Sequence, residues 1–289
     1  MRNRKYLPGL LLLLALTVGC AGEGETQSSP PPPPSESVYA ATGWGNPNVE
    51  KNEYQSEAFT QVGGFTIYTG ADAASHIGID VSSHQKEIDW EQVAQSGVSY
   101  AMIRAGYRGY STGNLNRDGY FDTNMQGALD AGLRVGVYFF SQAVTREEAI
   151  AEAVQVLEWV KDYDVTYPIV FDWEEIPDAE ARTDTVTAET VTECAKAFCA
   201  VIEAAGYIPM VYFNQNQGYQ VMNLEQLSDY DFWLARYTET PDFEYHFEMW
   251  QYSCTGSVPG IEDAVDLNIC FVDYPTEENE GLPPEETEE

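Results

Sequence analysis

The stretch Ile169-Val170-Phe171-Asp172-Trp173-Glu174-Glu175 joins an apolar run to a group of acids. A run of β-branched and aromatic residues of this length is typical of a buried strand. Because side chains alternate along a strand, Asp172 and Glu174 point to the same side, with Cα atoms roughly 6.6 Å apart. Trp173 points to the other side, where we expect a structural role. The two carboxyl groups are therefore spaced so that they can converge on one small substrate.

Strand-like and helix-like stretches alternate on both sides of this segment. The eight predicted strands cover residues 77–81, 100–105, 135–140, 168–173, 208–213, 232–236, 247–252 and 265–271. The four predicted helices cover residues 89–95, 122–131, 146–161 and 188–205. This alternation predicts an α/β fold with a parallel sheet. Eight strands with few late helices favour a barrel with an irregular second half, and an open doubly wound sheet is the alternative.

Two further predicted strands carry acids, namely Asp80 in 77–81 and Asp266 in 265–271. The carboxyl ends of parallel barrel strands gather at one mouth, so we expect these acids to meet Asp172 and Glu174 there. Clustered carboxyl groups raise each other's pKa, and one then holds a proton while its neighbours are ionised. Glycoside cleavage needs that division of labour. The alternative is that these acids only cap helices or accept hydrogen bonds from loop amides.

The region from about His76 to Tyr274 resembles glycoside hydrolase family 25, the lysozymes of the Chalaropsis and cellosyl type. The order and spacing of several short segments carry the resemblance. These segments are Gly78-Ile79-Asp80-Val81-Ser82-Ser83-His84-Gln85, Ile103-Arg104-Ala105-Gly106-Tyr107, Gly136-Val137-Tyr138-Phe139-Phe140, Phe171-Asp172-Trp173-Glu174, Trp233-Leu234-Ala235-Arg236-Tyr237, Trp250-Gln251-Tyr252 and Val265-Asp266-Leu267-Asn268. One departure is Phe139, where relatives often carry histidine.

The resemblance implies a modified TIM-like barrel with five β/α units followed by three strands. It also implies hydrolysis of the β-1,4 bond between N-acetylmuramic acid and N-acetylglucosamine in peptidoglycan. Glu174 matches the family's general acid, and Asp172 matches the acid proposed to orient the substrate's own N-acetyl group for attack. Asp80 and Asp266 match two further acids of the site, and Tyr138 matches a site tyrosine. A glycan-binding module without catalytic activity is the alternative function.

Other polar and aromatic residues of these segments are candidates for holding the substrate. We expect Tyr138, Gln251 and Tyr252 to contact sugar rings, although buried aromatic residues in a barrel are more often part of the core. Arg104 is a candidate for ordering the acids, and a structural ion pair is its alternative. The three histidines lack the spacing of a zinc motif, so we expect no metal and no cofactor.

The amino terminus has the pattern of an export signal. A basic start and a short apolar run, too short to span a bilayer, predict a signal peptide over residues 1–19. Leu16-Thr17-Val18-Gly19-Cys20 resembles a bacterial lipobox, which predicts lipidation at Cys20 and a lipoprotein on the outer face of the cell membrane. Without lipidation, the protein would be secreted. Residues 20–37 are predicted to be a proline-rich stalk.

The remaining segments complete the domain plan. Residues 38–75 form an extension of unknown role, residues 76–275 the catalytic domain, and residues 276–289 an acidic disordered tail. The formal net charge of −33 excludes non-specific nucleic-acid binding. The resemblance implies that the partner is peptidoglycan, and we expect a monomer. Cys254 and Cys270 flank the last strand connection and form a candidate disulfide.

Overall fold

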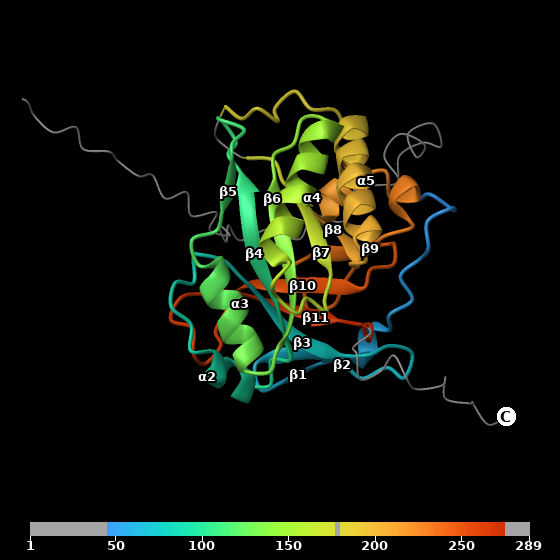
Figure 1. Ribbon diagram of the computed structural model, residues 1–289. Coiled ribbons are helices and arrows are strands. Elements are labelled where there is room, and N and C mark those ends of the chain that lie inside the picture. Colours follow the sequence, from blue (N-terminus) through green and yellow to red (C-terminus); the bar gives the residue numbers. More distant parts are fainter. Residues whose placement is uncertain (1–44, 177–179, 275–289) are drawn as a thin grey trace, which may run out of the picture. The chain divides into compact units, whose positions relative to one another are not determined.

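The computed structural model describes residues 45–176 and 180–274 (Figure 1). The predicted signal peptide, the stalk with Cys20 and the acidic tail at 276–289 lie outside these residues. Within the described residues, no helix is both long and apolar enough to cross a membrane.

Eight strands form a closed barrel. They are β3 (His76–Val81), β4 (Tyr100–Arg108), β6 (Arg134–Ser141), β7 (Ile169–Trp173), β8 (Pro209–Asn214), β9 (Asp231–Ala235), β10 (Met249–Gly256) and β11 (Val265–Cys270). Each strand pairs with the next, and β3 pairs with both β4 and β11, which closes the sheet. All neighbours are parallel except β11, which is antiparallel to β10 and to β3. Closure excludes the open doubly wound sheet.

An α-helix follows each of the first five barrel strands. These helices are α2 (Trp90–Gln95), α3 (Phe121–Asp130), α4 (Arg146–Val160), α5 (Ala188–Ala204) and α6 (Gln215–Gln220). In the described chain, β9, β10 and β11 follow with only the short 3-10 helix η2 (Leu224–Leu227) before β9. The predicted arrangement of five β/α units and three strands is confirmed. Figure 1 shows α4 and α5 side by side, α4 against β4 and β6, and α5 against β7 and β8.

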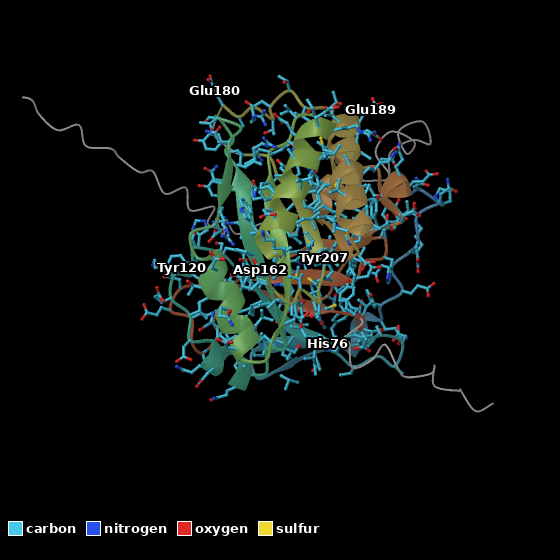
Figure 2. The ribbon with its side chains drawn as sticks, in the orientation of Figure 1. His76, Tyr120, Asp162, Glu180, Glu189 and Tyr207 are labelled. Atoms are coloured by element: carbon cyan, nitrogen blue, oxygen red, sulfur yellow. The ribbon has the colours of Figure 1, made fainter. Side chains whose placement is uncertain are left out.

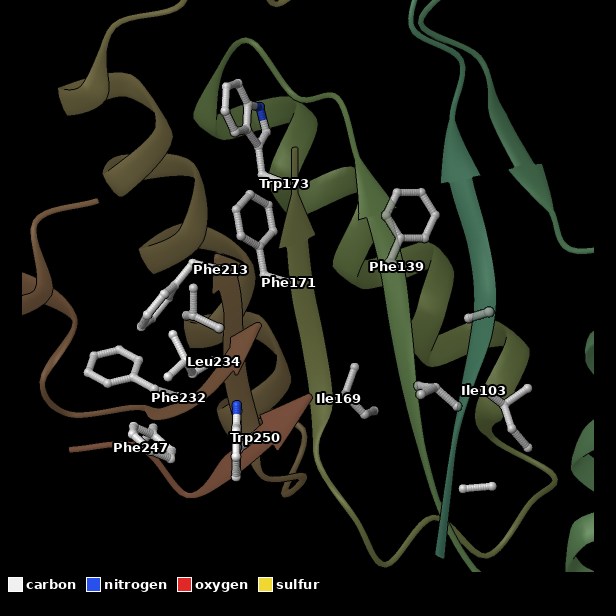
Figure 3. Close-up of a cluster of buried hydrophobic side chains, with 14 of the residues drawn as sticks. Ile103, Phe139, Ile169, Phe171, Trp173, Phe213, Phe232, Leu234, Phe247 and Trp250 are labelled. Carbon is white, nitrogen blue, oxygen red and sulfur yellow. The ribbon is translucent and has the colours of Figure 1, made fainter. Parts of the chain in front are cut away.

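The alternation of side chains divides the barrel wall into two buried faces. Phe171 and Trp173 lie in the larger hydrophobic cluster, between the sheet and the helices, and project from one side of β7 in Figure 3. Val170 lies in the smaller cluster that fills the barrel, together with Tyr100. A Cβ atom at Gly78 would lie 2.1 Å from the Tyr100 ring, so the filled interior requires glycine there. The structural position predicted for Trp173 agrees with this arrangement.

The extension before the barrel belongs to the same folded body from residue 45 onward. Its 3-10 helix η1 (Ser56–Ala58) leads into the hairpin of β1 (Phe59–Val62) and β2 (Phe65–Tyr68). Tyr54 stacks on Phe271 with ring centroids 4.2 Å apart, and its hydroxyl donates to the Phe247 carbonyl at 2.8 Å. The extension therefore covers aromatic side chains beside the last strands. The sequence did not indicate β1 and β2 as two separate strands. It also did not indicate the short strand β5 (Leu115–Arg117), which pairs with β4.

The predicted disulfide between Cys254 and Cys270 is wrong, because Cys270 is a buried free thiol. In the pairing of β10 with β11, Cys270 lies opposite Met249, five residues before Cys254. At the rise of a strand this offset is about 16 Å, whereas a disulfide requires Cα atoms within about 7 Å. Register along the two strands therefore keeps the pair apart.

Candidate active site

The structure brings the four predicted acids together at one mouth of the barrel. Asp80 near the end of β3 and Asp266 near the start of β11 are direct partners in the sheet. Because β11 runs antiparallel, its first residues lie at the mouth where the parallel strands end. Asp172 and Glu174 arrive there from β7, and the charges of the acids influence each other. In Figure 2, His76 at the start of β3 and Glu180 in the loop after β7 mark opposite ends of this body.

Two buried amides hold Asp80. Its Oδ2 accepts hydrogen bonds of 2.8 Å from Gln251 Nε2 and of 2.8 Å from Asn268 Nδ2. Gln251 Oε1 in turn accepts from the hydroxyls of Tyr212 at 3.1 Å and Tyr237 at 2.9 Å. Burial raises the pKa of Asp80 to about 6, and the two amide donors oppose this rise because they favour the ionised form. Asp80 is therefore an oriented carboxylate at neutral pH.

The sequence reasoning missed Asn268, Tyr212, Tyr237 and Trp233 as parts of this network. Trp233 Nε1 donates to Asn268 Oδ1 at 2.9 Å, which fixes the amide that faces Asp80. A signal for Asn268 was present, because it lies two positions after Asp266 and so on the same side of its strand. Tyr237 is half exposed at the mouth, while its hydroxyl reaches Gln251.

Asp172 and Glu174 form a carboxyl pair. Burial raises the pKa of Glu174 to about 7, and the nearby Asp80 adds to the rise. The pKa of Asp172 is raised well above its usual range, first by burial and then by Glu174 and Asp80. A hydrogen bond joins the two side chains, so the pair retains a proton at neutral pH. Asp172 Oδ1 is buried and has no hydrogen-bond partner among the residues that the structure describes.

Asp266 is a weak acid close to Glu174. Burial raises its pKa to about 9, with further contributions from Asp80 and Glu174. It is therefore protonated at neutral pH and presents a hydroxyl that can donate. Over residues 45–176 and 180–274, no three His, Cys, Asp or Glu side chains are arranged to hold a metal ion. The carboxyl groups of the site therefore differ in protonation at neutral pH, although they are chemically the same.

Arg104 and Tyr138 line the same mouth. Arg104 donates from Nε to Asp118 Oδ2 at 2.8 Å and from Nη2 to Ser83 Oγ at 3.1 Å, which is the structural ion pair considered as its alternative. Its charge lowers the pKa of Asp172. Tyr138 is close enough to Arg104 and to three of the acids for their charges to influence its hydroxyl, whose pKa burial raises well above its usual value. Arg104 therefore shapes the electrostatic field around Asp172, and Tyr138 lies beside the acids with its hydroxyl protonated.

Tyr252 does not belong to this group. It lies in the cluster outside the barrel wall, and its hydroxyl accepts a hydrogen bond of 3.1 Å from the Thr66 main chain in β2. The expected contact with substrate is therefore wrong for Tyr252, which instead joins the extension to the barrel. The adjacent Gln251 points inward, as alternation along a strand requires.

Comparison with known proteins identifies the class. The model of glycosyl hydrolases family 25 matches residues 79–261, and the chain belongs to this family. It is a glycoside hydrolase of the lysozyme type. It is similar to lysozyme M1 of Streptomyces globisporus, with 28% identity over 209 residues, covering 68% of this chain and 68% of the relative. It is also similar to the uncharacterized protein YegX of Escherichia coli K12, with 29% identity, covering 73% of this chain and 75% of the relative.

Solved structures share the fold. The family 25 glycosyl hydrolase of Bacillus anthracis superposes with a TM-score of 0.55 and 24% identity, covering 73% of this chain and 94% of that protein. The modular autolysin LytC of Streptococcus pneumoniae superposes with a TM-score of 0.63 and 22% identity, covering 74% of this chain. The chain spans about half of LytC, with 52% of that protein covered.

Proposed function

We propose that this protein is a muramidase that hydrolyses the β-1,4 bond between N-acetylmuramic acid and N-acetylglucosamine in peptidoglycan. The carboxyl pair of Asp172 and Glu174, which retains a proton beside the ionised Asp80, is the observation that carries the proposal. Support also comes from relatives named lysozyme M1 and autolytic lysozyme. LytC, which has a similar fold, has been solved in complex with a synthetic peptidoglycan ligand.

The residues suggest a substrate-assisted reaction. Glu174 in its protonated form gives its proton to the glycosidic oxygen as the bond to the sugar carbon breaks. Asp172 Oδ1 has no partner in the described chain, and it accepts the N–H of the substrate's N-acetyl group. The acetamido oxygen is thereby aimed at the same carbon and forms the new bond. Water then opens this intermediate after giving a proton to Glu174, and Asp80 stabilises the positive charge that develops.

The variant Glu174→Gln tests the assignment of the general acid. It keeps the size of the side chain but removes the proton donor, so the release of reducing ends from purified peptidoglycan should fall by about 10²- to 10⁴-fold. Mass spectrometry of the muropeptides measures the loss and identifies the bond. The matched control is Glu175→Gln, because Glu175 is the exposed neighbour and should be replaceable. Unchanged cleavage by Glu174→Gln would refute the assignment.

The same digestion distinguishes a muramidase from a glycan-binding module without catalytic activity. If the unaltered protein sediments with peptidoglycan but releases no new reducing ends at any pH between 4 and 9, the proposal of a muramidase is wrong. The alternative, a glycan-binding module, would then be favoured, with the acids at the mouth contacting a glycan without chemistry at Glu174.

We further propose that the protein is exported and anchored outside the cell membrane by a lipid on Cys20, with residues 20–37 as a stalk. The motivation is the signal-like pattern of residues 1–19 and the lipobox-like segment that ends at Cys20. Fractionation of cells that express the Cys20→Ala variant tests the anchor. The unaltered protein should remain with the membrane and the variant should not, and equal membrane retention would contradict lipidation.

A further inference from the structure

The proposed general acid lies beyond the end of its strand. Asp172 pairs with Phe140 of β6 and with Tyr212 of β8, and Trp173 pairs with Ser141 alone. The main-chain ladder of the described strands stops there, so Glu174 has no strand neighbour on either side. Its carboxyl group must nevertheless be held close to Asp172, because displacement of a reacting group by about 1 Å can cost about 10²-fold in rate.

Two glutamine side chains bind the main chain at this point. Gln142 Nε2 donates to the Glu174 carbonyl at 2.6 Å, and Gln217 Nε2 donates to the Trp173 carbonyl at 2.8 Å. Gln142 directly follows β6, and Gln217 lies in α6, which directly follows β8. Since β6 and β8 are the neighbours of β7, two consecutive carbonyls are held from both sides of the strand.

Both amides are themselves held in place. Gln142 is completely buried, its second N–H donates to the Ser141 carbonyl at 3.0 Å, and its Oε1 accepts from Thr183 Oγ1 at 3.1 Å. Gln217 Oε1 accepts from the Asn214 main chain at 3.0 Å. Amides that are hydrogen-bonded at both ends have little rotational freedom, so they transmit the positions of β6 and β8 to the end of β7.

Gln142 also contacts residues near the end of the loop that follows Glu174. Thr183 bonds to the Gln142 side chain, and Arg182 Nη1 donates to the Gln142 carbonyl at 2.8 Å. Arg182 in turn pairs with Glu148 in the first turn of α4 at 2.6 Å. Gln142 therefore binds both the start and the return of this loop.

We propose that Gln142 and Gln217 are positioning residues of the general acid. Their side-chain amides continue the sheet ladder past its last main-chain pair and hold Glu174 in line with Asp172. The inference rests on the proposed function of Glu174, because it concerns the precision of that residue's placement.

The variant Gln142→Met tests the proposal. Methionine has a similar length and no donor, so the Glu174 carbonyl loses its partner while the space stays filled. We expect kcat on peptidoglycan to fall about 10- to 100-fold and KM to stay within about twofold, because the substrate is still bound. The falling alkaline limb of kcat should move to lower pH, because a loosened Glu174 is less buried. Hydrogen exchange of the main chain at residues 174–176 and 180–183 should become faster.

The matched control is Thr192→Val, which removes a different buried side-chain partner. Thr192 lies on α5, where its hydroxyl donates to the Ala188 carbonyl and accepts from the Asn223 main chain, away from the acids. It should change thermal stability without moving kcat or its pH profile. If Gln142→Met behaves like this control, with unchanged kcat and pH profile, the positioning role is overturned.

Two further variants keep the test decisive if Gln142→Met does not fold. Gln217→Met removes the other amide donor, and Thr183→Val removes only the hydroxyl that orients Gln142. Each should lower kcat by about 3- to 30-fold at an unchanged KM, and full kcat in both overturns the proposal. Failure of the proposed function is distinguishable, because the unaltered protein would then release no reducing ends. Failure of the present inference leaves that protein active.

Discussion

At the scale of single residues, the site separates four identical functional groups by their surroundings. Asp80 accepts two amide N–H bonds and has a pKa of about 6. Asp266 accepts no side-chain hydrogen bond from the residues that the structure describes, and its pKa is about 9. Glu174 lies between them with a pKa of about 7. At neutral pH one acid is therefore ionised while protons remain on others, which is the condition for acid catalysis beside a stabilising charge.

The pH profile of kcat/KM tests this difference in protonation between Asp80 and Glu174. The profile should rise with pH through about 6, as Asp80 ionises, and fall above about 7, as Glu174 loses its proton. In Asp80→Asn, the charge that raises the pKa of Glu174 is absent, so the falling limb should move to lower pH by up to about one unit. The maximal rate should also fall by about 10²-fold, since the stabilising charge is lost.

The control for this variant is Asp263→Asn, because Asp263 is an exposed acid that pairs with Lys86. It should leave the profile unchanged. A falling limb that stays in place in Asp80→Asn would show that Asp80 does not control the protonation of Glu174.

At the scale of elements, the direction of one strand completes the site. Asp266 is the second residue of β11 and would lie at the opposite end of the barrel if that strand were parallel to its neighbours. The reversal places it beside Asp80. The connection from Gly256 to Val265 contains no helix and is shorter than the dozen or more residues that a parallel crossover requires. A short connection therefore decides which end of β11 meets the acids.

The extension before the barrel is a second element whose role depends on packing. Tyr54→Ala should lower the free energy of unfolding by about 2 to 3 kcal/mol, because a half-buried ring and its hydrogen bond to Phe247 are lost. Urea denaturation measures the change. Thr60→Ala on the exposed side of β1 is the control and should change it by less than about 0.5 kcal/mol. Equal stability of the two variants would mean that the extension does not support the barrel.

At the scale of the whole molecule, acidity should set the dependence of stability on pH. The pKa values of Asp80, Glu174, Asp266, Asp231 and Glu152 are all raised in the folded state, mainly by burial. A raised pKa means that the folded state binds the proton more tightly than the unfolded state. The resulting stabilisation of the folded state is complete at a pH below the pKa that the group has in the unfolded state. It is lost as the pH rises through the pKa that the group has in the folded state. Mutual repulsion within a net charge of −33 acts in the same direction.

The expected result is a higher Tm at pH 5.5 than at pH 8.5, by roughly 5 °C or more. Thermal denaturation at low and at high NaCl separates the two causes, because salt screens the surface repulsion but reaches the buried carboxyl groups much less. A Tm that is lower at pH 5.5 in high salt would contradict the contribution of the buried acids.

Local patterns in the sequence determined the barrel strands, four of the five α-helices that the structure describes, and part of the site. Alternation along residues 169–175 placed Asp172 and Glu174 on one side of β7 and Trp173 on the other, and the apolar runs located all eight barrel strands. These features depend on neighbouring residues alone. The same alternation applies to Gln251 and Tyr252, which are adjacent and so could not both face the interior.

Only the tertiary structure decided which distant groups meet. The register of β10 against β11 separates Cys254 from Cys270, and the reversal of β11 brings Asp266 to Asp80. The contact of the Gln142 amide with the Glu174 carbonyl joins residues 32 positions apart. The physical reason is that propensity and periodicity act over a few residues, whereas strand direction, register and protonation depend on long-range pairing and burial.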